Sequence, residues 1–275
     1  MASTPAFPHV ASRTLINSRA LDLAERIQLQ RWYHTIDLGN GQVTPGWFDM
    51  RPYVKHYGLP ERMDGMRVLD CGTWDGFWAF EMERRGATVV ALDVDHEWEY
   101  DSPPRRRPKD FPDTFRGDGF ELAKEALGSK VERVHCNLYE ASPEYLGGTF
   151  DLVFIGTVLI HLRDQLLALE RLASVSHGQF IFADEYDKAS QLVPWPVSRY
   201  HADRDAAVVF WLPAAKTWMR MIGTAGFDDV RHHGRYTLVL EGKLKIPHVV
   251  FHGRGTAPKV EATGPAPGSP VPPRQ

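Results

Sequence analysis

One stretch of the chain, residues 66–93, restricts the fold more than any other. We expect it to contain, in order, a buried strand at Arg67–Leu69, a tight turn at Cys71–Gly76, a helix at Phe77–Arg85 closed by Gly86, and a strand at Thr88–Asp93. A crossover of this kind makes its two strands parallel, and parallel sheets bind ligands at the carboxyl ends of their strands. The stretch therefore predicts an α/β fold with a ligand site where residues 70–76 meet Asp93.

The spacing of small residues in this turn indicates the kind of ligand. A turn that binds a dinucleotide needs small residues at its first, third and sixth places, so that a pyrophosphate can lie against bare backbone. Those places hold Gly72, Trp74 and Phe77. The indole of Trp74 would stand where a pyrophosphate must approach, which disfavours NAD.

The acidic and small residues of the same stretch suit a ligand without phosphate. Asp70, Gly72 and Gly76 can surround the amino-acid end of S-adenosylmethionine, which hydrogen-bonds to the turn. A carboxylate accepts two hydroxyl groups well, so Asp93 is expected to bind the ribose hydroxyls. The alternative is an ordinary α/β crossover in which an acid happens to end a strand.

Two later strands are expected to end at the same edge of the sheet. Val131–Cys136 is followed by Asn137 and Leu138, where an amide can pair with the adenine edge and an apolar side chain can flank its face. A plain turn residue is the alternative for Asn137. The apolar run Phe150–Thr157 suits the middle of a parallel sheet and should lie beside the first strand.

A titratable side chain follows that fourth strand. Since the strand should lie beside the first, we expect Gly156–His161 to face the methyl group of the cofactor. His161 is the first candidate for a catalytic base, because an ordinary imidazole has a pKa of about 6.5. A core histidine with both ring nitrogens bonded is the alternative.

The residues before the crossover are expected to form a helix and a lid. Apolar residues recur with helical spacing between Ser18 and Trp32. Residues 32–49 contain turn-forming glycines and prolines, yet carry Tyr33, His34 and Trp47. Aromatic side chains on a loop are unfavourable unless covered, so this segment should fold back over the cofactor. Tyr33 and Trp47 would then lie near substrate, with His34 as the second candidate base; simple packing of the loop is the alternative.

A long connection on the other side of the site is expected to cover substrate. Residues 187–213 follow a strand at Gln179–Ala183 and are long for a loop. Long, aromatic-rich connections at a ligand-binding edge usually cover substrate. The predicted substrate contacts here are Glu185, Tyr186, Trp195 and Tyr200.

The remaining segments complete the predicted domain. Helices are expected at Phe120–Leu127, Arg163–Ser174 and Ala214–Ala225, and closing strands at Asp229–His232, Tyr236–Glu241 and His248–His252. Residues 253–275 are rich in proline, glycine, alanine and threonine and are expected to be a disordered tail.

Composition and charge limit the partners. At 275 residues and 43% hydrophobic, the chain can bury a full α/β core as one decorated domain. Its net charge of -3 gives no general attraction to polyanions, although Arg105, Arg106, Arg107 and Lys109 form a short basic run that can bind a phosphate or an RNA backbone. More often such a run is solvated, so nucleic acid is an unlikely partner.

Cysteine content and hydropathy bear on the compartment. Cys71 and Cys136 make no disulfide framework and are expected to be buried free thiols. No apolar run reaches the length of a membrane span and no basic leader opens the chain, so we expect a soluble, cytoplasmic protein. No cluster has metal-ligand spacing, and no metal is predicted.

These motifs together resemble class I S-adenosylmethionine-dependent methyltransferases. The resemblance rests on Asp70-x-Gly72-x-x-Asp-Gly76, the acid at Asp93, the Phe150-Asp151 strand start, and the His161 segment with its leucine-rich helix. Within this class, the lead Thr35-Ile-Asp37 with Trp47-Phe-Asp49 is most similar to the branch of the tRNA wobble-uridine carboxymethyltransferase and its bacterial relatives of unassigned or secondary-metabolic substrate. The resemblance spans Trp32 to Gly226.

The resemblance implies a Rossmann-like, seven-stranded, mostly parallel sheet with helices on both faces and an antiparallel last strand. We expect an N-terminal helix and lid at 1–60, a methyltransferase domain at 61–252 and the tail at 253–275. The expected cofactor contacts are Asp70, Gly72, Thr73, Trp74, Gly76, Phe77, Asp93, Val94, Asn137, Leu138, Gly156 and Thr157.

One departure from that branch bears on the cofactor. The wobble-uridine enzymes have a tyrosine before the histidine that helps to hold an extra carboxylate of their cofactor, and here that place is Ile160. Plain S-adenosylmethionine is therefore expected, with methyl transfer to an oxygen, or a nitrogen, of a small molecule. A tRNA-modifying enzyme and a non-methylating S-adenosylmethionine-binding protein are the alternatives.

Overall fold

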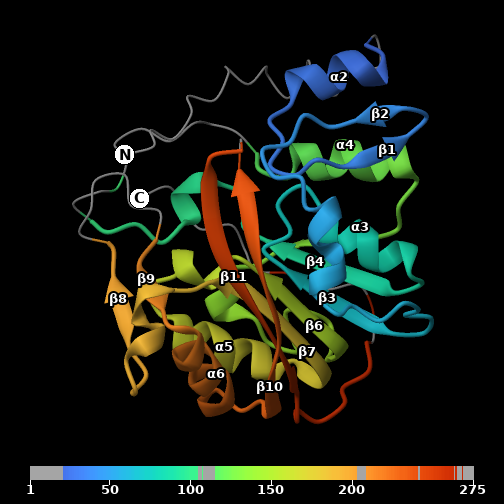
Figure 1. The fold of residues 1–275 in the computed structure, drawn as a ribbon. Helices are drawn as coiled ribbons and strands as arrows, with labels where there is room; N and C mark the ends of the chain where they lie inside the picture. Colours follow the sequence, from blue (N-terminus) through green and yellow to red (C-terminus); the bar gives the residue numbers. More distant parts are fainter. Residues whose placement is uncertain are drawn as a thin grey trace.

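A mixed sheet of seven strands forms the centre of the described chain (Figure 1). The computed structural model describes residues 21–104, 107, 115–202, 209–240, 242–262, 264 and 268. The strands of the sheet, in spatial order, are β10 (Asp228–Leu240), β11 (Leu244–Arg254), β7 (Ser176–Glu185), β6 (Phe150–Gly156), β3 (Arg67–Cys71), β4 (Thr88–Asp93) and β5 (Glu132–His135). The strands from β7 to β5 are parallel, and β11 is antiparallel to both of its neighbours. The predicted fold class is confirmed.

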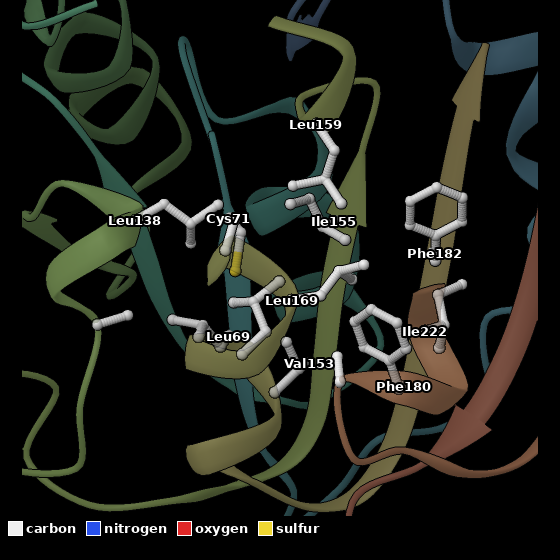
Figure 2. Packing of buried hydrophobic residues seen from close by; sticks show 14 of the residues in the cluster. Leu69, Cys71, Leu138, Val153, Ile155, Leu159, Leu169, Phe180, Phe182 and Ile222 are labelled. Atoms are coloured by element: carbon white, nitrogen blue, oxygen red, sulfur yellow. The ribbon is translucent and has the colours of Figure 1, made fainter. Parts of the chain in front are cut away.

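Two hydrophobic layers cover the two faces of this sheet, because successive side chains of a strand point to opposite faces. In β6, Val153 and Ile155 join the layer on the side of α5 (Gln165–Ser174) and α6 (Ala215–Thr224) (Figure 2). Leu152 and Phe154 join the layer on the side of α3 (Phe77–Arg84) and α4 (Asp118–Leu127). Because the parallel strands are buried on both faces, their polar residues are confined to the ends of the strands.

The N-terminal segment packs into the second layer. It contains α2 (Leu23–Leu29), a hairpin of β1 (Asp37–Gly39) and β2 (Gln42–Val43), and the 3-10 helix η1 (Arg51–His56). Trp32, Ile36 and Leu38 are buried in that layer. Within the described residues, the predicted helix is confirmed only over α2. The prediction of a loop at 32–49 was wrong for the part of the segment in which β1 and β2 form a hairpin.

The antiparallel end of the sheet differs from the prediction. The strands expected at Asp229–His232 and Tyr236–Glu241 are one strand, β10, whose register shifts between His232 and Gly234. A β-bulge of this kind adds a residue and bends the strand without ending it. The interval between the two predicted strands therefore contains a bulge and no break in the strand.

The chain after β11 is ordered further than predicted. Gly253 and Arg254 belong to β11, and the amides of Gly255 and Ala257 donate to Gly178 and Ser176 carbonyl oxygens at 2.7 and 3.0 Å. The Val260 carbonyl oxygen then accepts the Thr149 N–H at 2.9 Å, and the Val260 N–H donates to Thr149 Oγ1 at 2.8 Å. A disordered tail is therefore wrong for residues 253–262, and most residues beyond them lie outside the described part.

Two further features of the described residues bear on the predictions. Cys71 and Cys136 are free and buried, as predicted. No helix in the described residues is both long and apolar enough to span a bilayer. The predicted basic run falls mostly outside the described residues; its Arg107 donates to the Trp98 carbonyl oxygen at 2.6 Å.

Candidate functional site

The turn between β3 and α3 is shaped by close contacts at its glycines. Gly72 has φ +75°, and a Cβ there would lie 2.5 Å from the Val158 side chain. Gly76 has φ +92°, and a Cβ there would lie 2.4 Å from Phe80. Since both positions combine a left-handed backbone with a close neighbour, only glycine fits at either without a shift.

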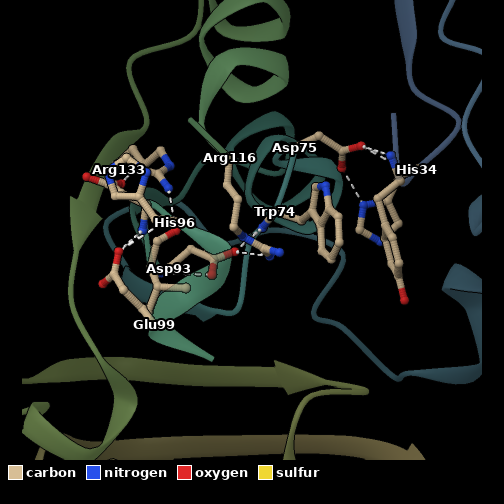
Figure 3. Close-up of polar contacts among 11 residues, drawn as sticks. His34, Trp74, Asp75, Asp93, His96, Glu99, Arg116 and Arg133 are labelled. Atoms are coloured by element: carbon tan, nitrogen blue, oxygen red, sulfur yellow. Dashed lines mark hydrogen bonds and ion pairs between the residues drawn. The ribbon is translucent and has the colours of Figure 1, made fainter. Parts of the chain in front are cut away.

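Asp93, at the end of β4, binds the same turn through hydrogen bonds. Its Oδ2 accepts the Trp74 N–H at 2.7 Å, and its Oδ1 accepts the Val94 N–H at 2.8 Å (Figure 3). Arg116 reaches the same Oδ2 at 3.4 Å, and its guanidinium lies 3.8 Å from the ring centroid of Trp74 and 4.5 Å from that of Tyr100. A carboxylate has about four acceptor sites, so Asp93 retains capacity for a further donor.

Asp75, within the turn, holds the N-terminal segment. Its side chain is fully buried, and Oδ2 accepts the N–H groups of Tyr33 and His34 at 2.8 and 2.7 Å. Its Oδ1 lies 2.5 Å from Nδ1 of His34 (Figure 3). The ring of Tyr33 stacks on Trp74 with centroids 4.3 Å apart. The predicted lid segment thus contacts the predicted cofactor turn.

Two polar atoms at the turn suit the amino-acid end of S-adenosylmethionine. Oδ2 of Asp70 and Oγ1 of Thr73 are buried without a hydrogen-bond partner among the described residues. Burial raises the pKa of Asp70 to about 7. An ammonium group at this position would give the carboxylate the partner that buried charges require. The residues present therefore fit the cofactor.

The end of β6 forms the wall beside this turn. Thr157 has φ +56°, and its N–H donates to the Ala183 carbonyl oxygen at 2.7 Å. The short helix η4 (Leu159–His161) follows, with the Leu159 N–H donating to Asp184 Oδ2 at 2.9 Å. His161, on this helix, is half-buried. The contact of Val158 with Gly72 brings this wall against the cofactor turn, as expected for strands β6 and β3.

The predicted adenine side lies at the ends of β4 and β5. Asn137 caps the 3-10 helix η3 (Leu138–Glu140), because its Oδ1 accepts the Tyr139 N–H at 3.0 Å. Leu138 is buried in the hydrophobic layer of α5 and α6, and Val94 is half-buried. The amide nitrogen of Asn137 is not used in this cap, so the adenine role stays a prediction.

The predicted substrate residues fall into two groups. Tyr33 lies at the turn, and Trp47 packs edge-on against Phe48, whose ring is 4.6 Å from that of Tyr33. On the other side, burial raises the pKa of Glu185 to about 7, and Tyr186 is buried in the hydrophobic layer of α5 and α6.

The remaining two lie further out on the predicted covering connection. This connection includes β8 (Ser198–Tyr200) and β9 (Trp211–Pro213), which form a hairpin. Trp195 is 63% and Tyr200 is 49% exposed, so the structure does not bring them into the enclosed part of the site. Phe210, next to β9, donates its N–H to the Ile160 carbonyl oxygen at 2.8 Å, which places the hairpin against η4.

Sequence reasoning missed two residues of the site. Asp75 was visible as the acid of the Asp-Gly76 pair, but its bonds to residues 33 and 34 depend on long-range packing. Arg116 has no local signal, since it precedes α4 after a proline-rich stretch. Its Nε and Nη1 are buried and have no partner among the described residues.

The comparisons with known proteins agree with this geometry. The methyltransferase-domain family matches residues 50–232. The tRNA U34 carboxymethyltransferase of Syntrophotalea carbinolica is 27% identical over 193 residues, which are 68% of this chain and 52% of that protein. That of Pseudomonas putida is 30% identical over 175 residues, 62% of this chain and 48% of the relative. The chain thus spans about half the length of the curated relatives it matches.

Solved structures show the same fold. The N-terminal domain of EvdMO1, crystallised in the presence of SAH and D-fucose, has a TM-score of 0.58 and 18% identity, covering 91% of this chain and 100% of that one. The YcgJ protein of Bacillus subtilis has a TM-score of 0.50 and 12% identity, covering 75% and 97%. The family match covers the parallel strands of the sheet, the turn and the wall described above, and the chain belongs to the methyltransferase-domain family of S-adenosylmethionine-dependent enzymes.

Proposed function

We propose that the chain transfers the methyl group of S-adenosylmethionine to an oxygen, or a nitrogen, of a small molecule such as a secondary metabolite. The observation that carries the proposal is the chemistry of the carboxyl edge. Around the turn and the wall, most of the side chains are carboxylates and aromatic rings, among them Asp70, Asp75, Asp184, Tyr33 and Trp74. The guanidinium of Arg116 is a cation at the turn, and it is paired with Asp93. Such a site suits a compact, neutral or cationic acceptor more than a polyphosphate backbone.

The site residues have separate roles in this proposal. S-adenosylmethionine supplies a methyl group on a positively charged sulfur, which is a good leaving group. Asp93 would bind the ribose hydroxyls and Asp70 the amino group. The N-terminal segment and the β8–β9 hairpin would exclude water and orient the acceptor. A hydroxyl acceptor must lose a proton, and His161 and His34 are the candidates to take it.

Modification of tRNA remains the second candidate, because the curated relatives carry that name. Ile160 favours plain S-adenosylmethionine as the cofactor instead. It stands where the resemblance places a tyrosine, and it is 2% exposed in the hydrophobic layer of α5 and α6. Its side chain offers no polar group to an additional carboxylate.

Calorimetry and product analysis test the proposed function. We expect the purified chain to bind S-adenosylhomocysteine, and Asp93→Ala to abolish that binding while the fold is retained. Incubation of small-molecule extracts with S-adenosylmethionine should give products heavier by one methylene group, detected by mass spectrometry. Modification of bulk tRNA, together with salt-sensitive RNA binding and no small-molecule product, would support the second candidate instead.

A further inference from the structure

The buried pair of His34 and Asp75 has the geometry of a histidine held by a carboxylate. Asp75 has no exposed surface, and the side chain of His34 is 8% exposed. The short contact joins Nδ1 of His34 to Oδ1 of Asp75 at 2.5 Å. Because an ionised carboxylate only accepts hydrogen bonds, Nδ1 must carry a proton. In the neutral ring, Nε2 then has a free lone pair.

The orientation of this ring is fixed from several sides. Oδ2 of Asp75 accepts the backbone N–H of His34 at 2.7 Å, so one carboxylate binds both the backbone and the ring. Phe77 stacks on the ring with centroids 5.5 Å apart, and Tyr33 lies edge-on at 4.8 Å. The backbone of His34 is also closely packed against Gly46, since a Cβ at Gly46 would lie 1.9 Å from the His34 carbonyl carbon. The ring therefore has little freedom to turn.

The pair lies at the carboxyl edge where the reaction is proposed to occur. Asp75 stands between Trp74 and Gly76 in the cofactor turn, and the positive form of His34 would interact electrostatically with Asp70 at the end of β3. Tyr33, the neighbour of His34, is within electrostatic range of Asp75, Arg116 and Asp184. The hydrogen bonds to Asp75 and the stacking of Tyr33 on Trp74 place residues 33 and 34 against the turn that follows β3.

We propose that Asp75 is a positioning residue that holds the proton of the neutral His34 ring on Nδ1, so that Nε2 can act as the general base for the methyl acceptor. This inference rests on the proposed methyl transfer. In the reaction, the acceptor oxygen would give its proton to Nε2 and form a bond to the methyl carbon. The carbon–sulfur bond would break, with its electron pair left on sulfur. The imidazolium formed at His34 would be stabilised by the Asp75 carboxylate.

Ring-nitrogen NMR tests the tautomer without any acceptor. Proton–nitrogen correlation spectra of ¹⁵N-histidine-labelled protein distinguish protonated from unprotonated ring nitrogens, and His34→Gln assigns the signal. We expect the neutral ring of His34 to carry its proton on Nδ1 and not on Nε2, with and without S-adenosylhomocysteine. Asp75→Asn should change this pattern, because an amide can donate as well as accept.

A second histidine–aspartate pair provides the matched control. Nε2 of His177 lies 3.0 Å from Oδ1 of Asp151, at the opposite ends of β6 and β7 from the site. Asp151→Asn should alter the signals of His177 and leave those of His34 unchanged. A neutral His34 ring with its proton on Nε2 would overturn the proposal, as would a tautomer that is unchanged in Asp75→Asn.

Kinetics with the acceptor identified by mass spectrometry complete the test. His34→Gln should lower kcat by a factor of about 10² to 10⁴, the usual contribution of a general base. Asp75→Asn should also lower kcat, because the ring loses the carboxylate that orients it.

The outcomes separate this inference from the proposed function. Retained S-adenosylhomocysteine binding with an undiminished rate in His34→Gln would leave methyl transfer in place and refute the assigned base. Loss of S-adenosylhomocysteine binding in the parent protein would instead refute the function itself, whatever the tautomer.

Discussion

Two non-glycine residues at the carboxyl edge adopt a left-handed backbone. Trp74 has φ +51° and Thr157 has φ +56°. Such conformations cost about 1 to 2 kcal/mol per residue and persist where the surroundings hold them. Here the Trp74 N–H is bound by Asp93 and the Thr157 N–H by the Ala183 carbonyl oxygen. The shape of the site therefore depends on bonds between strand ends, which local sequence preference does not reveal.

The glycines of the turn give a test at the residue scale. In Gly76→Ala, the new methyl group would meet Phe80 at 2.4 Å and Phe120 at 2.8 Å in addition to the backbone strain. Gly128 ends α4 with φ +61° and has nothing within 4 Å of a Cβ, so Gly128→Ala adds strain alone. We expect Gly128→Ala to cost about 1 kcal/mol and Gly76→Ala clearly more.

Urea unfolding and calorimetry measure both effects. Gly76→Ala should also weaken binding of S-adenosylhomocysteine, while Gly128→Ala should leave it unchanged. Equal losses of stability in the two variants would mean that Phe80 and Phe120 yield without cost, and that contact at the turn does not select glycine.

At the scale of elements, η4 is held from two sides. Asp184 accepts the N–H at its beginning, and the buried amide of Gln165 donates to the carbonyl oxygen of Leu159 at 2.9 Å. The same amide reaches the carbonyl oxygen of Trp211 at 3.2 Å, which joins η4 to β9. One side chain thus links the wall of the site to the β8–β9 hairpin.

Replacing this amide should loosen the wall. Gln165→Leu leaves two carbonyl oxygens without their donor, and we expect a loss of about 1 to 3 kcal/mol in the free energy of unfolding. Gln191→Leu is the matched control, because Gln191 is only half-buried and donates to a single carbonyl oxygen, that of Asp187. Its cost should stay within about 0.5 kcal/mol. Urea unfolding of both variants measures this, and a Gln165→Leu variant as stable as the control would contradict the link.

Elements formed by local periodicity were predictable, and those fixed by distant contacts were not. The apolar run of β6 and the strand–helix–strand unit around Gly72 follow from their own residues, and both are confirmed. The two strands predicted at 229–232 and 236–241 are one strand, because pairing with β11 continues across the bulge between His232 and Gly234. Residues 255–260 carry no apolar pattern, so the sequence did not indicate that they are ordered. Their contacts are mainly hydrogen bonds of backbone groups, which leave no pattern in the sequence. The bond between Asp75 and His34 was missed for the same reason.

At the scale of the whole molecule, the N-terminal segment is bound at two places, by the turn after β3 and by the antiparallel strands β10 and β11. Near the site, Asp75 binds its residues 33 and 34. At the outer strands, the Tyr57 hydroxyl hydrogen-bonds that of Tyr236, and the Tyr57 carbonyl oxygen lies 2.8 Å from Nε2 of His252. Tyr236 in turn stacks on His248 with centroids 4.8 Å apart. Loosening of the antiparallel edge should therefore reach the segment that carries His34.

Acid should destabilise this edge through His248. Burial lowers the pKa of His248 to about 4, and the ring is 1% exposed, whereas in the unfolded chain the value is about 6.5. The unfolded chain therefore binds a proton first as pH falls. The stability that His248 contributes is complete above about pH 6.5 and is lost progressively towards pH 4. At about pH 4.5 the loss amounts to about 2.5 kcal/mol.

Comparison with His248→Phe isolates this effect, because a phenyl ring can stack on Tyr236 but does not titrate. The difference in unfolding free energy between parent and variant, from urea titrations, should shift against the parent by that amount between about pH 7 and 4.5. His56→Phe is the control, since His56 also stacks on Tyr236 but is only half-buried. This control measures the cost of replacing a stacked imidazole on Tyr236 by a phenyl ring. A pH-independent difference for His248→Phe would show that the buried ring keeps an ordinary pKa, and that the acid sensitivity of this edge has another source.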